Sequence, residues 1–204
     1  MRKVLVAVAG LATALAAGSA ANAADPIKIG MVMSYSGQFA DPTAQMDNGV
    51  KLYMKQHGDT VAGRKIEIIR KDDGGINPPL SKRLTQELIV RDKVDILAGY
   101  TNSPSGFVAA DVSQEAKKFT VFMLAATSGI ITHSKYLARA SFTIPANVGT
   151  LGTWAAKSGI KRVYMMTTDY APGKDAEAAF TANFKAAGGE IVGSVRMPPA
   201  NPDF

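Results

Sequence analysis

Short apolar segments alternate with amphipathic segments along most of the chain. Residues 27–33 form a nearly continuous apolar run, which is typical of a strand buried on both faces of a parallel sheet. Residues 41–56 then carry apolar side chains at helical spacing, with Asp41 and Pro42 suited to its N-cap and first position. Strands that alternate with helices predict an α/β fold with doubly wound parallel sheets. Further strands are expected at 65–71, 94–97, 120–124, 162–167 and 190–195, and further helices from Asn77, from Ser103 or Ser105 to about Lys118, at 148–157 and at 174–187.

The alternation is interrupted near Pro145 by a short extended piece. We therefore expect a first α/β lobe at residues 24–140, a hinge crossover at 141–147 and a second α/β lobe at 148–204. The second lobe is expected to hold only two strands, and two parallel strands do not form a stable sheet alone. It is therefore predicted to be incomplete, and the chain to be an N-terminal fragment of a longer protein.

The first 23 residues have the pattern of a cleaved export signal. Arg2 and Lys3 precede an apolar run at 4–17, and Ala21 and Ala23 are small residues placed before a cleavage site. A membrane anchor is the alternative, but the run is shorter than the ~20 apolar residues that a span requires. No cysteine follows the run, which excludes a lipoprotein anchor. The protein is expected to be exported through a cleaved signal peptide and, in a Gram-negative bacterium, to be periplasmic.

The composition excludes several kinds of chemistry. The chain has no cysteine, so disulfides, thiol catalysis and cysteine-bound zinc are excluded. His57 and His133 are the only histidines, and no catalytic or phosphate-binding motif occurs, so neither a metal nor a cofactor is expected. The net charge is +6 without a block of lysine and arginine, so nucleic acid is not an expected partner. Asp72 and Asp73 precede two glycines and are interpreted as surface carboxylates of a turn.

Hydroxyl side chains follow two of the expected strands. Ser103 lies where the third strand gives way to a helix, and Thr127 follows the fourth strand. Ligands of open α/β sheets bind at the carboxyl ends of strands, and helix starts favour anions. Both residues are also common helix caps, which is the alternative interpretation. Phe39 and Tyr100 are expected to flank the same cleft and Tyr170 to stack on a ligand, with loop packing as the alternative for all three.

Five segments of the chain occur in the order and at the spacing found in one known family. They are IKIGMVMSYSGQFAD, KIEIIRKDDGGINPPLS, VDILAGYTNSPSG, FMLAATSGI and VYMMTTDYAPGKDAEAAF. In these segments the chain resembles the type I periplasmic substrate-binding proteins of ABC importers, most closely their branched-chain amino acid (Leu/Ile/Val)-binding branch. The resemblance implies two α/β lobes that are joined by hinge strands and close around a small ligand. It also implies a longer chain, in agreement with the expected fragment.

The resemblance assigns roles to particular residues. Ser103 matches the family serine whose hydroxyl binds the ligand carboxylate. Ala125, Ala126 and Thr127 match a segment that contributes backbone groups and a threonine hydroxyl. Tyr170 lies near the position of a pocket aromatic in the second lobe. The acidic residue that commonly pairs with a ligand ammonium comes later in the second lobe of the family than the residues present here.

The function expected from these observations is binding without catalysis. The protein is expected to be the extracytoplasmic component of an ABC importer that holds a small carboxylate-bearing solute, such as an amino acid, between its lobes. Its expected partners are that ligand and an inner-membrane permease, and it is expected to be a monomer. One alternative is a ligand sensor that feeds a receptor. Another is a secreted α/β hydrolase with Ser103 as nucleophile and His133 as base, although Ser103 lies in no nucleophile-elbow motif.

The export signal makes the first testable prediction. Mass spectrometry of the exported protein is expected to give an N-terminus at Ala24, because the small residues before it suit signal peptidase. The variant Ala23→Phe places a bulky side chain at the cleavage site and is expected to accumulate as the uncut precursor. A cytoplasmic protein that retains Met1 would contradict the prediction.

Overall fold

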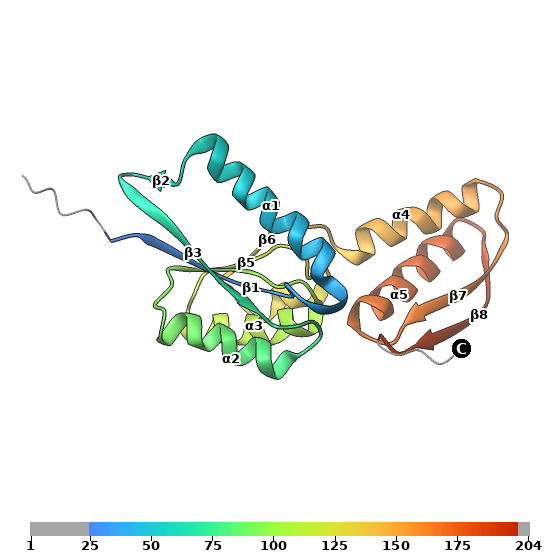
Figure 1. The fold of residues 1–204 in the computed structure, drawn as a ribbon. Helices are drawn as coiled ribbons and strands as arrows, with labels where there is room; N and C mark the ends of the chain where they lie inside the picture. Colours follow the sequence, from blue (N-terminus) through green and yellow to red (C-terminus); the bar gives the residue numbers. More distant parts are fainter. Residues whose placement is uncertain (1–24, 200–204) are drawn as a thin grey trace, which may run out of the picture.

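The computed structural model describes residues 25–199, which form two separate sheets with their helices (Figure 1). The predicted export signal lies outside the described residues. We call β1–β6 with α1–α3 the first lobe, and α4–β8 the second lobe. The first lobe comprises β1 (Ile27–Met33), η1 (Gly37–Phe39), α1 (Ala40–His57), β2 (Thr60–Val61), β3 (Arg64–Asp72), α2 (Pro78–Val90), β4 (Ile96–Gly99), α3 (Ser103–Ala116), β5 (Thr120–Phe122), η2 (Ser128–Thr132) and β6 (Leu137–Arg139), where η marks a 3-10 helix. The second comprises α4 (Ile144–Lys157), β7 (Arg162–Thr168), α5 (Ala171–Ala186) and β8 (Glu190–Met197).

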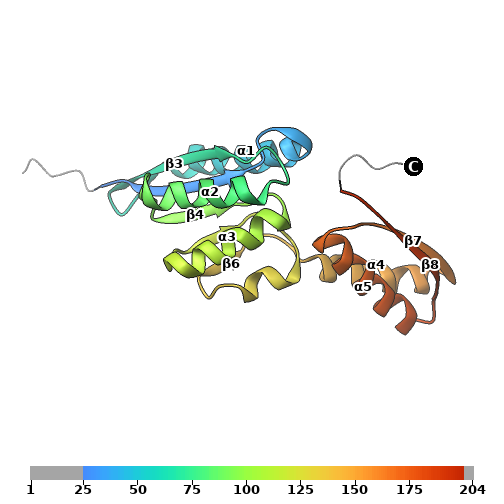
Figure 2. The ribbon, with the colours of Figure 1, turned by 90° about the horizontal axis from the view of Figure 1, so that it is seen from below.

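The first-lobe sheet has the strand order β2-β3-β1-β4-β5-β6, and every neighbouring pair is parallel except β2 with β3. Helices α2 and α3 lie on one face of this sheet and α1 lies on the other (Figures 1 and 2). Because both faces are covered, successive residues of a central strand are buried, as Met31, Val32 and Met33 of β1 are. The predicted doubly wound α/β fold is therefore confirmed.

The second-lobe sheet pairs β7 with β8 in parallel. Helices α4 and α5 pack on one face of it, where Ala155, Ala156 and Phe184 form a small core with Val163 and Ile191. Apolar side chains that alternate with these are exposed, among them Tyr164 at 62%, Met166 at 61% and Val195 at 42%. Among the described residues, no helix is long and apolar enough to cross a membrane.

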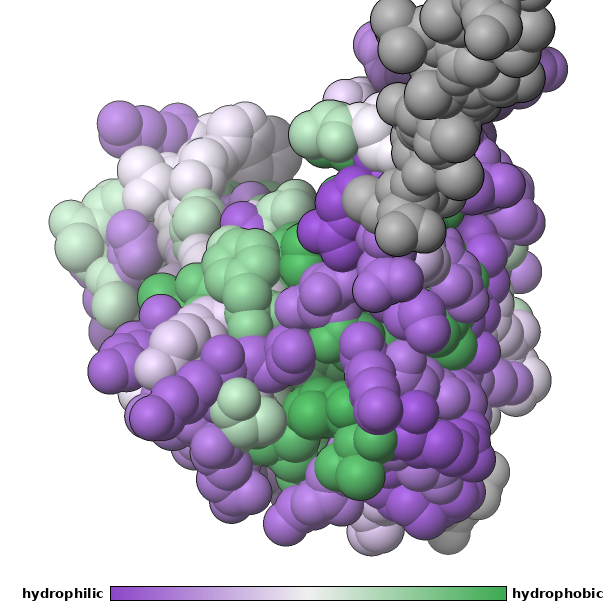
Figure 3. Space-filling view, turned by 90° about the vertical axis from the view of Figure 1, so that its left-hand side faces the viewer, coloured by the Kyte–Doolittle hydropathy of each residue, from purple (hydrophilic) through white to green (hydrophobic). Residues whose placement is uncertain are grey.

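Helix α1 leaves an apolar hollow of about 450 Å³ between itself and the sheet. Figure 3, which faces the side of the molecule at the left of Figure 1, shows hydrophobic surface lying between hydrophilic flanks. The hollow is lined by Ile29, Met46, Gly49, Val50, Tyr53, Met54, Ile66, Ile68 and Met123. The apolar residues that recur at helical spacing along α1 therefore line a surface depression, and Tyr53 is 63% exposed.

The helix starts agree only in part with the expected caps. Asn77 caps α2 as expected, because its side chain accepts a hydrogen bond from the Leu80 N–H at 3.2 Å. Helix α3 is capped by Asn102, whose side chain accepts from the Ser105 N–H at 2.9 Å, rather than by Ser103 or Ser105. Helix α1 begins at Ala40, so Asp41 lies inside its first turn and is not the N-cap.

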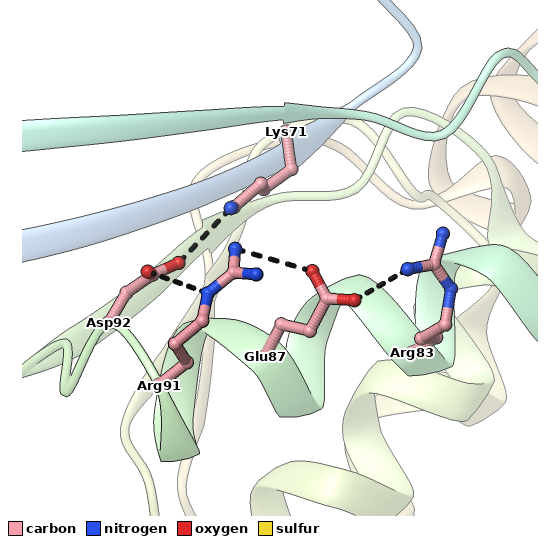
Figure 4. A network of polar contacts seen from close by, with 5 residues as sticks. All are labelled: Lys71, Arg83, Glu87, Arg91 and Asp92. Carbon is pink, nitrogen blue, oxygen red and sulfur yellow. Dashed lines mark hydrogen bonds and ion pairs between the residues drawn. The ribbon is translucent and has the colours of Figure 1, made fainter.

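An ion-pair network fixes the end of α2 to the sheet (Figure 4). Lys71 of β3 lies 3.1 Å from Asp92, and both side chains are less than one-fifth exposed. Arg91 bridges Asp92, at 3.3 Å, and Glu87, at 3.5 Å, and Glu87 also pairs with Arg83. Burial alone raises the pKa of Asp92, but the bonds from Lys71 and Arg91 outweigh it and hold that pKa below its ordinary value. The loop from α2 to β4 is thereby held against β3.

The carboxyl group of Asp73 joins four elements of the first lobe inside the protein. Asp73 follows β3 and is fully buried. Its Oδ1 accepts from the hydroxyl of Ser34, after β1, at 2.6 Å, and its Oδ2 accepts from Ser81 of α2 at 2.7 Å and Ser105 of α3 at 3.0 Å. The interpretation of Asp73 as a surface carboxylate is therefore wrong, whereas Asp72 is exposed as expected. Burial is possible because every bond replaces one that water would make.

Removing this carboxyl group is expected to destabilise the protein strongly. In the natural full-length protein, Asp73→Ala should lower the free energy of unfolding by about 3 kcal/mol or more, because three hydroxyls lose a buried acceptor. Urea denaturation measures the change. The matched control is Asp59→Asn, which alters a carboxylate that is 49% exposed and is expected to change stability by only about 0.5 kcal/mol or less. Equal effects of the two variants would contradict the role given to Asp73.

Candidate ligand-binding site

A cavity of about 150 Å³ lies where the two lobes meet. Three segments of the first lobe reach it: η1, the loop from β4 into α3, and the loop after β5. The second lobe contributes the start of α5, and the connection into α4 closes the remaining side. The lining residues are Phe39, Thr101, Asn102, Ser103, Leu124, Ala125, Ala126, Phe142, Ile144, Tyr170 and Pro172.

The loop from β4 into α3 is placed by a turn that only glycine permits. Gly99 has φ +108°, and a Cβ there would collide with the carbonyl oxygen of Val32 in the neighbouring strand. The next residue, Tyr100, also has a positive φ of 64°, and its side chain turns into the core, fully buried. Its hydroxyl lies 3.1 Å from Thr85 Oγ1 and its ring packs edge-on against Phe122. The expectation that Tyr100 flanks the cleft is therefore wrong.

Hydrogen bonds hold the three residues after Tyr100 at the cavity edge. Thr101 Oγ1 accepts from the Ser34 N–H at 3.0 Å, and the Asn102 side chain donates to the Gly75 carbonyl at 3.0 Å. Asn102 also caps α3, as described above, so Ser103 begins the helix with its position fixed on both sides. Ser103 is 1% exposed.

The loop after β5 lies directly beside Ser103. The Thr127 N–H donates to Ser103 Oγ at 3.3 Å, so the serine hydroxyl keeps its own hydrogen for another acceptor. The Thr127 hydroxyl is buried and has no hydrogen-bond partner among the described residues. A Cβ at Gly106 of α3 would lie only 3.0 Å from the Cβ of Ala125, so glycine permits this close approach. The loop that carries Thr127 therefore adjoins Ser103, which lines one end of the cavity.

Aromatic and aliphatic side chains form the rest of the wall. Phe39 comes from η1, Phe142 from the connection between the lobes and Tyr170 from the start of α5. Tyr170 is half-buried, and burial raises the pKa of its phenol, so the hydroxyl is neutral at physiological pH. No acidic or basic side chain lines the cavity in the described part of the chain.

Arg139 supports the wall from outside the cavity. It ends β6, and its guanidinium donates to the carbonyl oxygens of Thr127 at 2.7 Å and of Phe142 at 3.4 Å. Burial lowers the pKa of Arg139, against the opposing effect of the Asp175 charge. The side chain thus ties the hydroxyl end of the cavity to the connection between the lobes.

The structure brings most of the predicted site residues together. Phe39, Ser103, Ala125, Ala126 and Tyr170 line the cavity, Thr127 adjoins Ser103, and Tyr100 lies in the core. Whether the lining residues bind a ligand stays a prediction. Sequence reasoning missed Thr101, Asn102, Leu124, Phe142, Ile144 and Pro172. Of these, Asn102 carried a readable signal, since Asn before Ser-Pro suits an N-cap.

Neither histidine lies at the cavity. His133 bonds to Asp111 of α3 at 2.9 Å and packs edge-on against Phe107. His57 stacks on Tyr53 at the end of α1. Among residues 25–199, no three histidine, cysteine or acidic side chains are grouped as metal ligands would be.

Comparison with known proteins places this chain in a family. Residues 26–204 match the family described as "Periplasmic binding protein". A curated relative, Leu/Ile/Val-binding protein homolog 6 of Brucella abortus (strain 2308), is 38% identical over 199 residues, or 98% of this chain and 51% of the relative. The chain therefore spans about half the length of the curated relatives it matches.

Two solved structures from Rhodopseudomonas palustris are also similar. A solute-binding protein of an ABC transporter from strain BisB5, in complex with 3,4-dihydroxybenzoic acid, is 49% identical with a TM-score of 0.84, over 88% of this chain and 49% of that one. A second, in complex with 4-hydroxybenzoate, is 40% identical with a TM-score of 0.85, over the same shares of the two chains. The fold and the sequence match agree, and the chain belongs to the periplasmic binding protein family.

Proposed function

We propose that this chain forms the first lobe and part of the second lobe of an ABC-importer solute-binding protein that captures small aromatic carboxylates in the periplasm. The observation that carries the proposal is the cavity itself. Ser103 lines one end and Thr127 adjoins it, three aromatic residues line the wall, and no charged side chain lines the cavity in the described residues.

The hydroxyl end suits a carboxylate. The Ser103 hydroxyl keeps a free hydrogen and the Thr127 hydroxyl is buried without a partner among residues 25–199, so both can donate to an anionic oxygen. Helices α3 and α5 both begin at the cavity, at Ser103 and Ala171, and the positive ends of helices stabilise negative charge. A hydrogen bond to a charged group contributes about 1.5–3 kcal/mol.

The rest of the cavity suits an aromatic ring. An engineered protein cavity of roughly 150 Å³ binds benzene, and this cavity has a similar volume. Phe39, Phe142 and Tyr170 supply rings from three separate segments, and aromatic pairs favour edge-on or offset contacts. The similar proteins from R. palustris, solved with hydroxylated benzoic acids, support this choice of ligand.

An aliphatic amino acid would need a partner for its ammonium group from the part of the second lobe that lies beyond this chain. Its ammonium group needs a carboxylate or carbonyl partner when it leaves water, because an unpaired buried charge is costly. No acidic side chain lines the cavity among the described residues. The name of the curated relative, a Leu/Ile/Val-binding protein homolog, makes leucine the competing ligand for an experiment.

The importer role follows from the family rather than from the cavity. A solute-binding protein passes its ligand to an inner-membrane permease and needs no catalytic group. The hydrolase alternative would use His133 as the base, but His133 bonds to Asp111 and is not a cavity residue. Loss of solute uptake on deletion of the gene tests the importer role against the sensor alternative.

The proposed ligand class predicts a preference for aromatic carboxylates over leucine that can be measured directly. With the natural full-length protein, calorimetry is expected to give tighter binding of 4-hydroxybenzoate or 3,4-dihydroxybenzoate than of leucine. At a hundredfold excess over Kd the bound ligand should add about 2.7 kcal/mol to stability, which a thermal-shift assay detects. Benzyl alcohols of matched size are the control, because they keep the ring and lack the carboxylate. Binding of leucine in preference to both acids would overturn the proposed ligand class.

The two hydroxyls can be tested separately from the fold. Thr127→Val keeps the side-chain shape and removes a hydroxyl that has no partner among the described residues, so the ligand-free protein should lose no stability. Carboxylate binding is expected to weaken about tenfold, and Ser103→Ala should act in the same direction. Ser158→Ala, an exposed serine at the end of α4, is the matched control and should leave the affinity unchanged. Unchanged affinity in Thr127→Val and Ser103→Ala would show that neither hydroxyl binds the ligand carboxylate.

A further inference from the structure

A side-chain contact joins the two lobes beside the cavity. Oδ2 of Asp175, near the start of α5, accepts from the backbone N–H of Ser128 at 2.8 Å and from the Ser128 hydroxyl at 3.0 Å. Ser128 directly follows Thr127 at the hydroxyl end of the cavity. Asp175 comes one helical turn after Pro172, which lines the wall of the second lobe. The contact therefore fastens the two walls of the cavity to each other.

A partly buried cation lies near the same contact. Arg139 donates to the carbonyl of Thr127, and its Nε atom is buried without a partner among residues 25–199. Burial lowers the pKa of Arg139, and the charge of Asp175 raises it. The two charges therefore interact electrostatically across the lobe boundary. Separating the lobes would remove this counter-charge and both hydrogen bonds at once.

We propose that Asp175 is a positioning residue for ligand binding, which holds the second lobe against the first through Ser128. Asp175 is not a cavity residue, so it acts on the ligand through Ser128 and the neighbouring Thr127. The inference rests on the proposed function, because it takes the cavity as the place where the ligand binds.

The expected effect on affinity follows from the populations of closed and open molecules. If only the closed form presents both walls, the apparent affinity is proportional to the fraction of molecules that are closed. The bonds to Asp175 are solvent-exposed, which limits their contribution. Loss of the carboxylate is therefore expected to reduce the closed fraction, and to weaken apparent binding, about fivefold.

The experiment measures closure without a ligand and affinity with one. The chain has no cysteine, so cysteines introduced at exposed Lys82 of α2 and Lys157 of α4 can carry two spectroscopic labels. The distance between the labels is compared in the natural full-length protein with and without Asp175→Ala. The affinity for 4-hydroxybenzoate is measured by calorimetry in the same variants. Asp175→Asn, which keeps the side-chain volume, replaces the alanine variant if circular dichroism shows that alanine disturbs the fold.

A matched control lies on the same helix. Glu177→Gln also converts a carboxylate to a neutral group, but Glu177 bonds to Ser194 and Arg196 within the second lobe. Both closure and affinity are expected to stay unchanged in this variant. Ser128→Ala should reproduce part of the Asp175→Ala effect and should add nothing in the Asp175→Ala background, because the two residues share one contact.

The outcomes separate this inference from the proposed function. A longer distance between the labels in ligand-free Asp175→Ala, together with weaker binding, supports the positioning role. A folded Asp175→Ala protein with an unchanged distance and unchanged affinity overturns it, and so do fully additive effects of Ser128→Ala and Asp175→Ala. If none of the aromatic acids binds, the proposed ligand class fails, while the distance measurement still decides whether Asp175 holds the lobes together.

Discussion

The buried carboxyl group of Asp73 sets the geometry on which the candidate site depends. A polar group without access to water must find its partners inside the protein, and Asp73 finds them in serines from three other elements. These bonds permit one mutual arrangement of the strand ends and helix starts at this edge of the sheet. Asn102 adds to the same arrangement through the carbonyl of Gly75. Ser103 directly follows Asn102 in the sequence. The bonds of Asp73 and Asn102 therefore fix the position of the Ser103 hydroxyl, although Ser103 makes none of these bonds itself.

The alternation of strands and helices could be predicted because its cause is local. A parallel strand covered on both faces is apolar along nearly all of its length, and the segment at 27–33 has this pattern, with Lys28 as its one charged residue. The three-residue strand β6 and the two-residue strand β2 were not predicted, since so few residues carry no periodicity. Helix starts were predicted within a few residues, but the choice among neighbouring cap residues was not always correct.

The errors at the site arise from long-range contacts. An Asp-Asp-Gly-Gly sequence has the local pattern of a surface turn, and nothing within it shows that Ser34, Ser81 and Ser105 surround Asp73. Tyr100 follows a strand, as a cleft residue often does, but two successive positive φ values turn it into the core. Phe142 lies in the connection between the lobes and Ile144 begins α4 directly after it, and no sequence pattern shows that both line the wall, because their place depends on how the lobes meet.

The framework around Asp73 has a consequence for how such a protein acquires a new solute. The serines that bond Asp73 depend on one another, so a substitution within this set of bonds disturbs several elements together and moves the carboxylate-facing end of the cavity that they support. Phe39, Phe142 and Tyr170 belong to three separate segments outside that set of bonds. During evolution they can be replaced one at a time at little cost to stability. Descendants of this protein would then bind solutes that differ in their ring or side group but share the same carboxylate.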